Sequence, residues 1–183
     1  MIYSFLEDYF VRTLLESDLS GPYPFWFEDQ EITRYNSHGK FFKNRSYFEE
    51  YYRSLNYEDR LVWAICHKSD GHIGNISLQN ISFIDRNAEF AVILGNKAHH
   101  GKGVSFQAGK KLLHHGFEKL NLEKIYCGTA SENLPMQKLA LSLGMKEEGR
   151  RKKHVFLNGA YQDVLEYGIL VEDWLRFKKE SAL

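Results

Sequence analysis

The stretch HHGKGVS, His99 to Ser105, decides the fold because it separates a strand pattern from a helix pattern. An apolar run, Ala88–Leu94, precedes it, and apolar residues then recur at helical spacing from Val104 to Leu120. Its two glycines let the backbone approach a ligand closely. The first amides of the following helix have no partner within the helix, and the helix dipole adds positive charge there. The stretch therefore predicts a backbone cradle for a pyrophosphate, beside which Lys102 either adds a charge or is solvated.

Two common nucleotide-binding folds do not fit this stretch. A dinucleotide-binding GxGxxG turn requires a third glycine where Phe106 stands, and it belongs to a parallel βαβ unit. A P-loop requires a Gly-Lys pair followed by Ser or Thr, which the sequence lacks. The cradle therefore belongs to another architecture.

Upstream of the cradle, the pattern is one strand, two helices and a three-stranded meander. Asp70-Gly71 is a strong hairpin signal within the meander. Ser46, with Glu49 three residues on, has the spacing of a capping box and predicts a helix start. The expected elements are a strand Tyr9–Leu14, a helix from Ser17 or Asp18 to about Phe27, a turn-rich segment Glu31–Gly39, a helix from Ser46 to about Leu55, and strands Leu61–His67, His72–Ile84 and Ala88–Leu94.

Downstream of the cradle helix, the sequence predicts a strand, a helix, a hairpin and a terminal helix. Asn158-Gly159 is the strongest hairpin dipeptide, and Gly144 is placed just past the end of a helix. The expected elements are a strand Lys124–Thr129, a helix that ends before Gly144, hairpin arms Met145–Leu157 and Ala160–Leu170, and a helix Glu172–Glu180.

Together these elements predict an α/β (α+β) fold, a mixed, mostly antiparallel sheet of about seven strands with helices on both faces. No repeat, low-complexity tract or linker divides the chain, so we expect one domain over residues 1–183.

Composition excludes several classes of protein. The chain has 24 basic and 24 acidic residues, which argues against a nucleic-acid binder with a broad basic face. No apolar run is long enough to span a bilayer, and the start lacks the features of a signal peptide, so we expect a soluble cytoplasmic protein without membrane contact. The two cysteines are too few for a disulfide framework. The histidine pairs 99/100 and 114/115 lack metalloenzyme spacing, so no metal site is expected.

Four features in a fixed order identify a family resemblance. They are the glycine turn before a helix, Asn133 after the next strand, the LGM helix end at Leu143–Met145 and the final Asn-Gly hairpin. In this order the sequence resembles the GNAT superfamily of N-acetyltransferases, nearest the branch with ribosomal-protein N-terminal and spermidine acetyltransferases. The resemblance covers about residues 9–171.

The resemblance implies acetyl-CoA as co-substrate, bound in a V-shaped splay between the strands that end at Leu94 and Thr129. Backbone groups of Val92, Ile93 and Leu94 would bind the pantetheine arm as an added strand would. The pyrophosphate would lie on the turn and the helix start, which comprise His100, Gly101, Lys102, Gly103, Val104 and Ser105. Asn133 would contact the pantetheine arm, or alternatively cap the helix that follows it, with Ser131 as a rival for that cap.

The sequence departs from the family at three positions. His100 replaces the usual Gln or Arg, and Ser105 replaces a usual Gly or Ala. Many members carry a general-acid tyrosine where this chain has Ala140. Protonation of the departing thiolate is thus left to solvent, to Ser131 or to a tyrosine from elsewhere.

Direct attack by an amine requires a base, because amines are mostly protonated at neutral pH. Glu89 is the candidate, since it stands among Ala88, Phe90 and Ala91, where carboxylates are uncommon. Its alternative role is as a solvent-facing residue or a partner for Arg86. No covalent enzyme intermediate is required.

The segment Glu31–Gly39 lies in the region where the family binds its acceptor. Tyr35, Asn36 and His38 suit a hydroxyl-rich acceptor, so the expected acceptor is a small amine such as a nucleotide-linked amino sugar. An ordinary turn has the same composition. Two other acceptors stay open, namely a polyamine and a ribosomal or other protein N-terminus. A binding module without turnover also stays open, and the chain could form a homodimer. The acidic residues that favour a polyamine are Glu28, Asp29, Glu31, Glu49 and Glu50.

Overall fold

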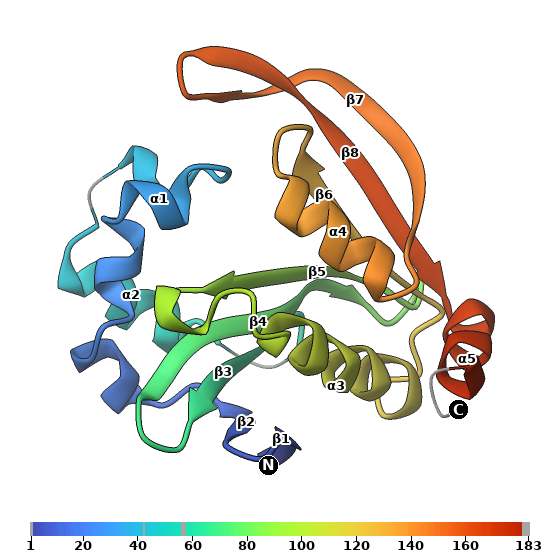
Figure 1. Ribbon diagram of the computed structural model, residues 1–183, viewed down its shortest axis with the longest axis horizontal. Helices are drawn as coiled ribbons and strands as arrows, with labels where there is room; N and C mark the ends of the chain where they lie inside the picture. The colour runs from blue at the N-terminus through green and yellow to red at the C-terminus, as the bar shows by residue number, and fades with distance from the viewer. Residues whose placement is uncertain (1, 42, 56–57, 181–183) are drawn as a thin grey trace.

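The computed structural model of the chain describes residues 2–41, 43–55 and 58–180, and its strands form one eight-stranded sheet (Figure 1). The spatial order is β1-β2-β3-β4-β5-β6-β8-β7. All neighbouring strands are antiparallel except β5 and β6, which are parallel. The strands are β1 (Ile2–Leu6), β2 (Tyr9–Thr13), β3 (Leu61–His67), β4 (Gly71–Ser82), β5 (Asn87–Leu94), β6 (Lys124–Ala130), β7 (Lys146–Leu157) and β8 (Ala160–Leu170).

Both faces of the sheet are covered by helices, as predicted. Along β3, Trp63 and Ile65 join one core while Val62, Ala64 and Cys66 join the other, as expected when side chains alternate across a strand. The first core lies under α3 (Val104–Glu118), α4 (Leu134–Ser142) and α5 (Val171–Glu180). The second lies under the short helices η1 (Glu16–Ser20), η2 (Pro24–Phe27), α1 (Gln30–Thr33), η3 (His38–Lys40) and α2 (Arg45–Arg53).

The sheet has one strand more than the seven or so expected. The extra strand is β1, which pairs only with β2 at the edge of the sheet. The apolar residues of β1 do not mark it as a core strand, because Ile2 and Leu6 are exposed. Tyr3 instead anchors the strand, since its ring lies 5.3 Å from that of Trp63 and its hydroxyl bonds to His115.

Two expectations for the N-terminal helices were wrong. The segment from Asp18 to Phe27 forms two 3-10 helices, η1 and η2, because Gly21-Pro22 and Pro24 interrupt a regular helix. Asp18 does not cap a longer helix there. The cap of α2 is Asn44, whose side chain accepts from the Tyr47 amide at 3.0 Å. Ser46 thus lies inside the first turn of α2, and Glu49 pairs with Arg45 in place of closing a capping box.

The two central parallel strands pair only briefly. Asn87–Glu89 of β5 lies beside Lys124–Tyr126 of β6, and beyond these residues the two strands separate (Figure 1). This confirms the V-shaped splay. η4 (Lys97–His99) and the glycine turn then lead from the end of β5 into α3.

The β7–β8 hairpin crosses from the C-terminal half of the sheet to the N-terminal helices. Its turn residues Asn158 and Gly159 both have positive φ, 53° and 81°, as a tight hairpin turn requires. The Asn158 side-chain amide donates to the Arg34 carbonyl at 3.2 Å, which ties the turn to the end of α1. The predicted hairpin and terminal helix are confirmed. Within the described residues, none of the helices has the length and apolar character needed to cross a bilayer.

Candidate active site

The glycine turn takes the left-handed backbone conformation that its sequence suggests. Gly101 and Gly103 have φ of 73° and 74°, which L side chains rarely adopt. A Cβ atom on either would meet no atom of the described part of the chain within 4 Å, so the space over the turn is open there. The first helical bond of α3 runs from the Gln107 amide to the Gly103 carbonyl, so the amides of residues 104–106 are left to face a ligand or solvent.

His100 closes this turn onto the end of β5. Its Nε2 donates to the Leu94 carbonyl at 2.8 Å. The side chain that replaces the family's usual Gln or Arg is therefore occupied by a bond within the protein, whereas Lys102 is exposed beside it. The cradle predicted for the pyrophosphate thus consists of backbone, with Lys102 as the nearby charged side chain.

The three β5 residues expected to bind pantetheine do not all direct their backbone groups to the same side of the strand. The Gly95 amide donates to Ile73 of β4, so alternation in an antiparallel pair directs Ile93 toward β4 as well. Val92 and Leu94 then direct their backbone groups into the splay. The bond from His100 to the Leu94 carbonyl fits this arrangement. An extended ligand would accordingly meet Val92 and the Leu94 amide, and not Ile93.

Glu89 lies at the last position that β5 shares with β6, the vertex of the splay. Its neighbours Ala88 and Phe90 are buried in the core under α3, so the Glu89 side chain lies on the opposite face of the sheet. One carboxylate oxygen accepts from the Asn80 side-chain amide at 2.9 Å. Arg86 is not its partner, because Arg86 pairs with Glu123 and Asn121.

Two further ionisable residues, absent from the sequence-based prediction, lie near Glu89. Tyr126 is the register partner of Glu89 across the parallel pair, and Glu166 of β8 is the partner of Gly128. Burial, followed by the charges of Glu89 and Glu166, raises the pKa of the Tyr126 phenol. Arg151 of β7 donates to Glu166 at 2.6 Å. The Tyr126 phenol at the vertex is therefore protonated and feels the charges of the Glu89 and Glu166 carboxylates.

The sequence does carry a signal for these two residues, because each stands between two buried apolar residues along its strand. Tyr126 stands between the buried Ile125 and Cys127. Glu166 stands likewise between Leu165 and Tyr167. Period-two alternation directs both side chains to the same face as Glu89. Their meeting depends on the strand order, which the sequence alone did not supply.

Ser131 and Asn133 lie where β6 meets α4. The Asn133 side-chain oxygen accepts from the Met136 amide at 3.2 Å, so Asn133, and not Ser131, caps α4. Capping uses only that oxygen and leaves the side-chain NH₂ group able to donate to a ligand. The Ser131 backbone bonds to Asp163 and to the Gln137 side chain. Ala140, at the position of the family's usual tyrosine, is completely buried.

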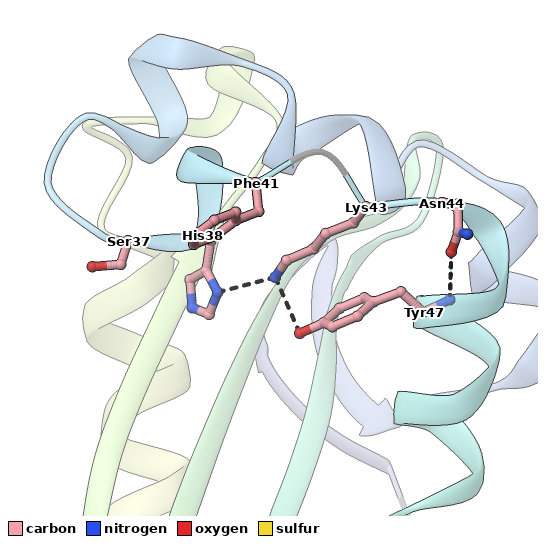
Figure 2. A pocket seen from close by; sticks show the side chains of 6 residues that line it. All are labelled: Ser37, His38, Phe41, Lys43, Asn44 and Tyr47. Atoms are coloured by element: carbon pink, nitrogen blue, oxygen red, sulfur yellow. Dashed lines mark hydrogen bonds between the residues drawn. The ribbon is translucent and has the colours of Figure 1, made fainter.

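A cavity of about 670 Å³ lies beside the turn-rich segment (Figure 2). Lys43 is held at its centre, where its ammonium donates to His38 at 3.4 Å and to the Tyr47 hydroxyl at 3.1 Å. The Tyr47 ring lies 4.3 Å from the same ammonium. Desolvation, and then the Lys43 charge, lower the pKa of the His38 imidazole. The lining residues are Ser37, His38, Phe41, Lys43, Asn44 and Tyr47.

Of the three residues expected to bind the acceptor, only His38 lines this cavity. The Asn36 side chain accepts from the His38 amide at 2.9 Å and so shapes the turn. The Tyr35 ring packs under the Arg34 guanidinium, 4.6 Å from its centroid. Lys43, Phe41 and Tyr47 were not predicted, because the sequence does not reveal that the start of α2 folds against the His38 turn.

The acidic residues that favour a polyamine are largely paired. Lys97 bonds to Asp29 at 2.9 Å and to Glu31 at 2.6 Å, and it lowers the pKa of Asp29. Glu49 pairs with Arg45 and Arg53 along α2. These carboxylates are therefore already partnered by cations of the chain itself.

Comparison with known proteins identifies relatives for most of the chain. A domain profile described as "Acetyltransferase (GNAT) domain" matches residues 10–146. The spermidine N(1)-acetyltransferase of Vibrio cholerae is 39% identical over 103 residues, 56% of this chain and 59% of that protein. The ribosomal-protein-serine acetyltransferase of Escherichia coli (strain K12) is 32% identical over 105 residues, 57% of this chain and 58% of that protein. The chain thus spans less than two thirds of the length of these relatives.

A solved structure covers more of the chain. The crystal structure of spermidine N-acetyltransferase from Vibrio cholerae, in complex with CoA and spermine, superimposes with a TM-score of 0.84 at 28% identity. The alignment covers 93% of this chain and 99% of the other.

Proposed function

Because the chain belongs to the GNAT acetyltransferase family, we propose that it transfers an acetyl group from acetyl-CoA to a primary amine. The observation that carries this proposal is the open glycine turn at the start of α3, beside the splay of β5 and β6. Backbone amides at a helix start suit a pyrophosphate. The unpaired edge of β5, at Val92 and Leu94, suits the pantetheine arm.

In the proposed reaction, the amine nitrogen attacks the thioester carbonyl, and the carbon–sulfur bond then breaks. Glu89 at the vertex takes the proton that the amine loses. The Leu94 amide, which faces the splay, is placed to stabilise the oxyanion. The departing thiolate regains a proton from the Ser131 hydroxyl, from the Tyr126 phenol or from water. The raised pKa keeps that phenol protonated near neutral pH.

For the acceptor, we propose a small molecule and specifically a nucleotide-linked amino sugar. The cavity beside His38 combines a cation, Lys43, with the aromatic residues Phe41 and Tyr47. A lysine suits a phosphate group, and aromatic faces suit a nucleobase. His38, neutral because its pKa is lowered, offers hydrogen bonds to sugar hydroxyls.

A polyamine is the second candidate, favoured by the relatives named as spermidine acetyltransferases. Polyamines are polycations and need free carboxylates. Among the residues that the structure describes, the cavity lining contains a lysine and no Asp or Glu, and Asp29, Glu31 and Glu49 are paired. A protein N-terminus is the third reading, supported by the ribosomal-protein relative.

Acetyl-CoA turnover with a panel of amines tests these proposals. The panel contains nucleotide-linked amino sugars, the corresponding free amino sugars, spermidine and N-terminal peptides, with free thiol release as the readout. We expect turnover with the nucleotide-linked sugars and weaker turnover with the free sugars. Preference for spermidine or for peptides would contradict the acceptor proposal. Binding of acetyl-CoA without turnover by any amine would indicate a binding module.

A further inference from the structure

We propose that His67, Asp70 and His99 bind one divalent transition-metal ion of the Zn²⁺ type, apart from the residues assigned to acetyl transfer. His67 is the last residue of β3, and Asp70 lies in the turn before β4. His99 ends η4, directly before the glycine turn. Two separate parts of the chain, the β3–β4 turn and the end of η4, thus meet at one point, which the sequence alone does not reveal.

The ligand atoms have nearly the separations that an ion requires. One ligand atom from each residue lies within 4.8 Å of the other two. Asp70 Oδ2 lies 2.8 Å from His99 Nε2 and 3.5 Å from His67 Nδ1. Ligand atoms about 2.1 Å from a zinc ion are about 3.0 to 3.4 Å apart at octahedral and tetrahedral angles. To admit the ion, His67 Nδ1 must give up its contact with the Ser69 hydroxyl at 3.0 Å, and the His67 and Asp70 side chains must rotate to bring the ligand atoms closer together.

A second layer of hydrogen bonds already orients these side chains. The Tyr9 hydroxyl bonds to His99 Nδ1 at 2.9 Å, on the far side of the imidazole from Asp70. With an ion on Nε2, His99 carries its proton on Nδ1 and donates it to Tyr9. Ser69 donates to the other Asp70 oxygen at 2.6 Å. Such outer partners commonly fix metal-binding imidazoles and carboxylates.

The burial of the three side chains and the types of their ligand atoms define the class of ion that suits the site. The His99 side chain is 3% exposed, that of His67 19% and that of Asp70 41%, so the site is fixed on the inside and open to solvent outside. Three protein ligands leave coordination positions for water. Two imidazoles with one carboxylate suit Zn²⁺, Co²⁺ or Ni²⁺, whereas Mg²⁺ prefers oxygen ligands alone.

Calorimetric titration of the full chain, without an affinity tag, tests the site with Zn²⁺ and with Mg²⁺. We expect one equivalent of Zn²⁺ to bind and Mg²⁺ not to compete. His67→Ala and Asp70→Asn should each weaken Zn²⁺ binding about tenfold or more. Both positions are at least partly exposed, so the variants should fold, which the melting temperature checks. The visible absorption of bound Co²⁺ reports the ligand geometry independently.

His114→Ala is the matched control. His114 pairs with Glu118 one turn along α3 at 3.0 Å, so it is another histidine–carboxylate pair of the chain. Its replacement should leave the Zn²⁺ affinity unchanged. The proposal is overturned if the wild type binds no stoichiometric Zn²⁺, or if His67→Ala and Asp70→Asn retain wild-type affinity. In either case the cluster is a hydrogen-bonded ion pair that supports the loop. No readout depends on acetyl transfer, so failure here leaves the proposed function untouched.

Discussion

Glu89 combines a position at the vertex of the splay with a face directed away from the α3 core. If it takes the amine proton, Glu89→Gln should lower turnover about 100-fold and leave acetyl-CoA affinity nearly intact. Glutamine keeps the shape and can still bond to Asn80. Turnover and calorimetric affinity are measured together. Glu123→Gln, an exposed acidic residue paired with Arg86, is the control and should behave as wild type. Normal turnover of Glu89→Gln across the pH range would make Glu89 structural.

Gly103 tests the cradle at the level of one residue. Valine there adds a side chain to the open space beside the turn, where the pyrophosphate should lie, so acetyl-CoA should bind about tenfold more weakly, or ~1.4 kcal/mol. The positive φ of Gly103 also strains any L side chain placed there, so a control variant with the same strain is needed. Gly159→Val carries the same strain, with φ of 81° and an open Cβ position, at the hairpin tip. Equal acetyl-CoA affinity in both variants would remove the cradle from the proposal.

At the scale of elements, a partly buried ion pair joins β2 to η1. Arg12 donates to both Asp18 oxygens at 2.7 and 2.8 Å, and His72 of β4 lies 3.6 Å from the same carboxylate. Burial opposes ionisation of Asp18, but the bonds from Arg12 and from the Leu15 amide outweigh it, so the Asp18 pKa lies below its usual value. Burial lowers the pKa of His72.

The sign of the resulting pH dependence follows from these two shifts. A depressed folded pKa means that stability is present above the unfolded pKa, about 4 for Asp and 6.5 for His, and is lost as pH falls through the folded value. Asp18→Asn leaves Arg12 unpaired and should cost about 3 kcal/mol at pH 7. It should also flatten the loss of stability as the pH falls below about 4, the unfolded pKa of Asp. Denaturant unfolding at several pH values measures both effects. An unchanged acid slope in Asp18→Asn would assign acid sensitivity to other groups.

The elements differ in how far the sequence predicts them. The β3–β4–β5 meander is predictable because Asp70-Gly71 and the β-branched runs signal it locally. β1 is not, because its stability comes from pairing with β2 and from Tyr3 against Trp63. The glycine turn before α3 is a local feature, and its left-handed conformation follows from Gly101 and Gly103. Tyr126, Glu166 and the His67–Asp70–His99 cluster depend on the register of distant strands and on loops that fold together.

At the scale of the whole molecule, the proposed cofactor site and the proposed acceptor cavity belong to different groups of helices. The cradle helix α3 and α4 cover one face and share one core. The short N-terminal helices, with the Lys43 cavity, share a separate core on the other face. The Asn158–Arg34 bond connects the β7–β8 hairpin to that second group. Changes in the cavity should therefore alter acceptor binding without disturbing the cofactor side.

Lys43→Met tests this separation. Methionine keeps an unbranched apolar side chain but removes the ammonium that lies over the Phe27 and Tyr47 rings. If Lys43 binds an acceptor phosphate, the Michaelis constant for a nucleotide-linked amino sugar should rise about tenfold, because a charge-assisted hydrogen bond contributes about 1.5 kcal/mol or more. The constant for acetyl-CoA should hardly change. Salt should weaken acceptor binding by the wild type and have less effect on the variant.

Lys40→Met is the control, since Lys40 is exposed in the same segment and is absent from the cavity lining. Its acceptor kinetics and salt dependence should match the wild type. A polyamine acceptor predicts the opposite sign for Lys43→Met, because removal of a positive charge would favour a polycation. The direction of the change in the acceptor Michaelis constant thus separates the two acceptor classes in one measurement, while the melting temperature confirms that the cavity has not collapsed.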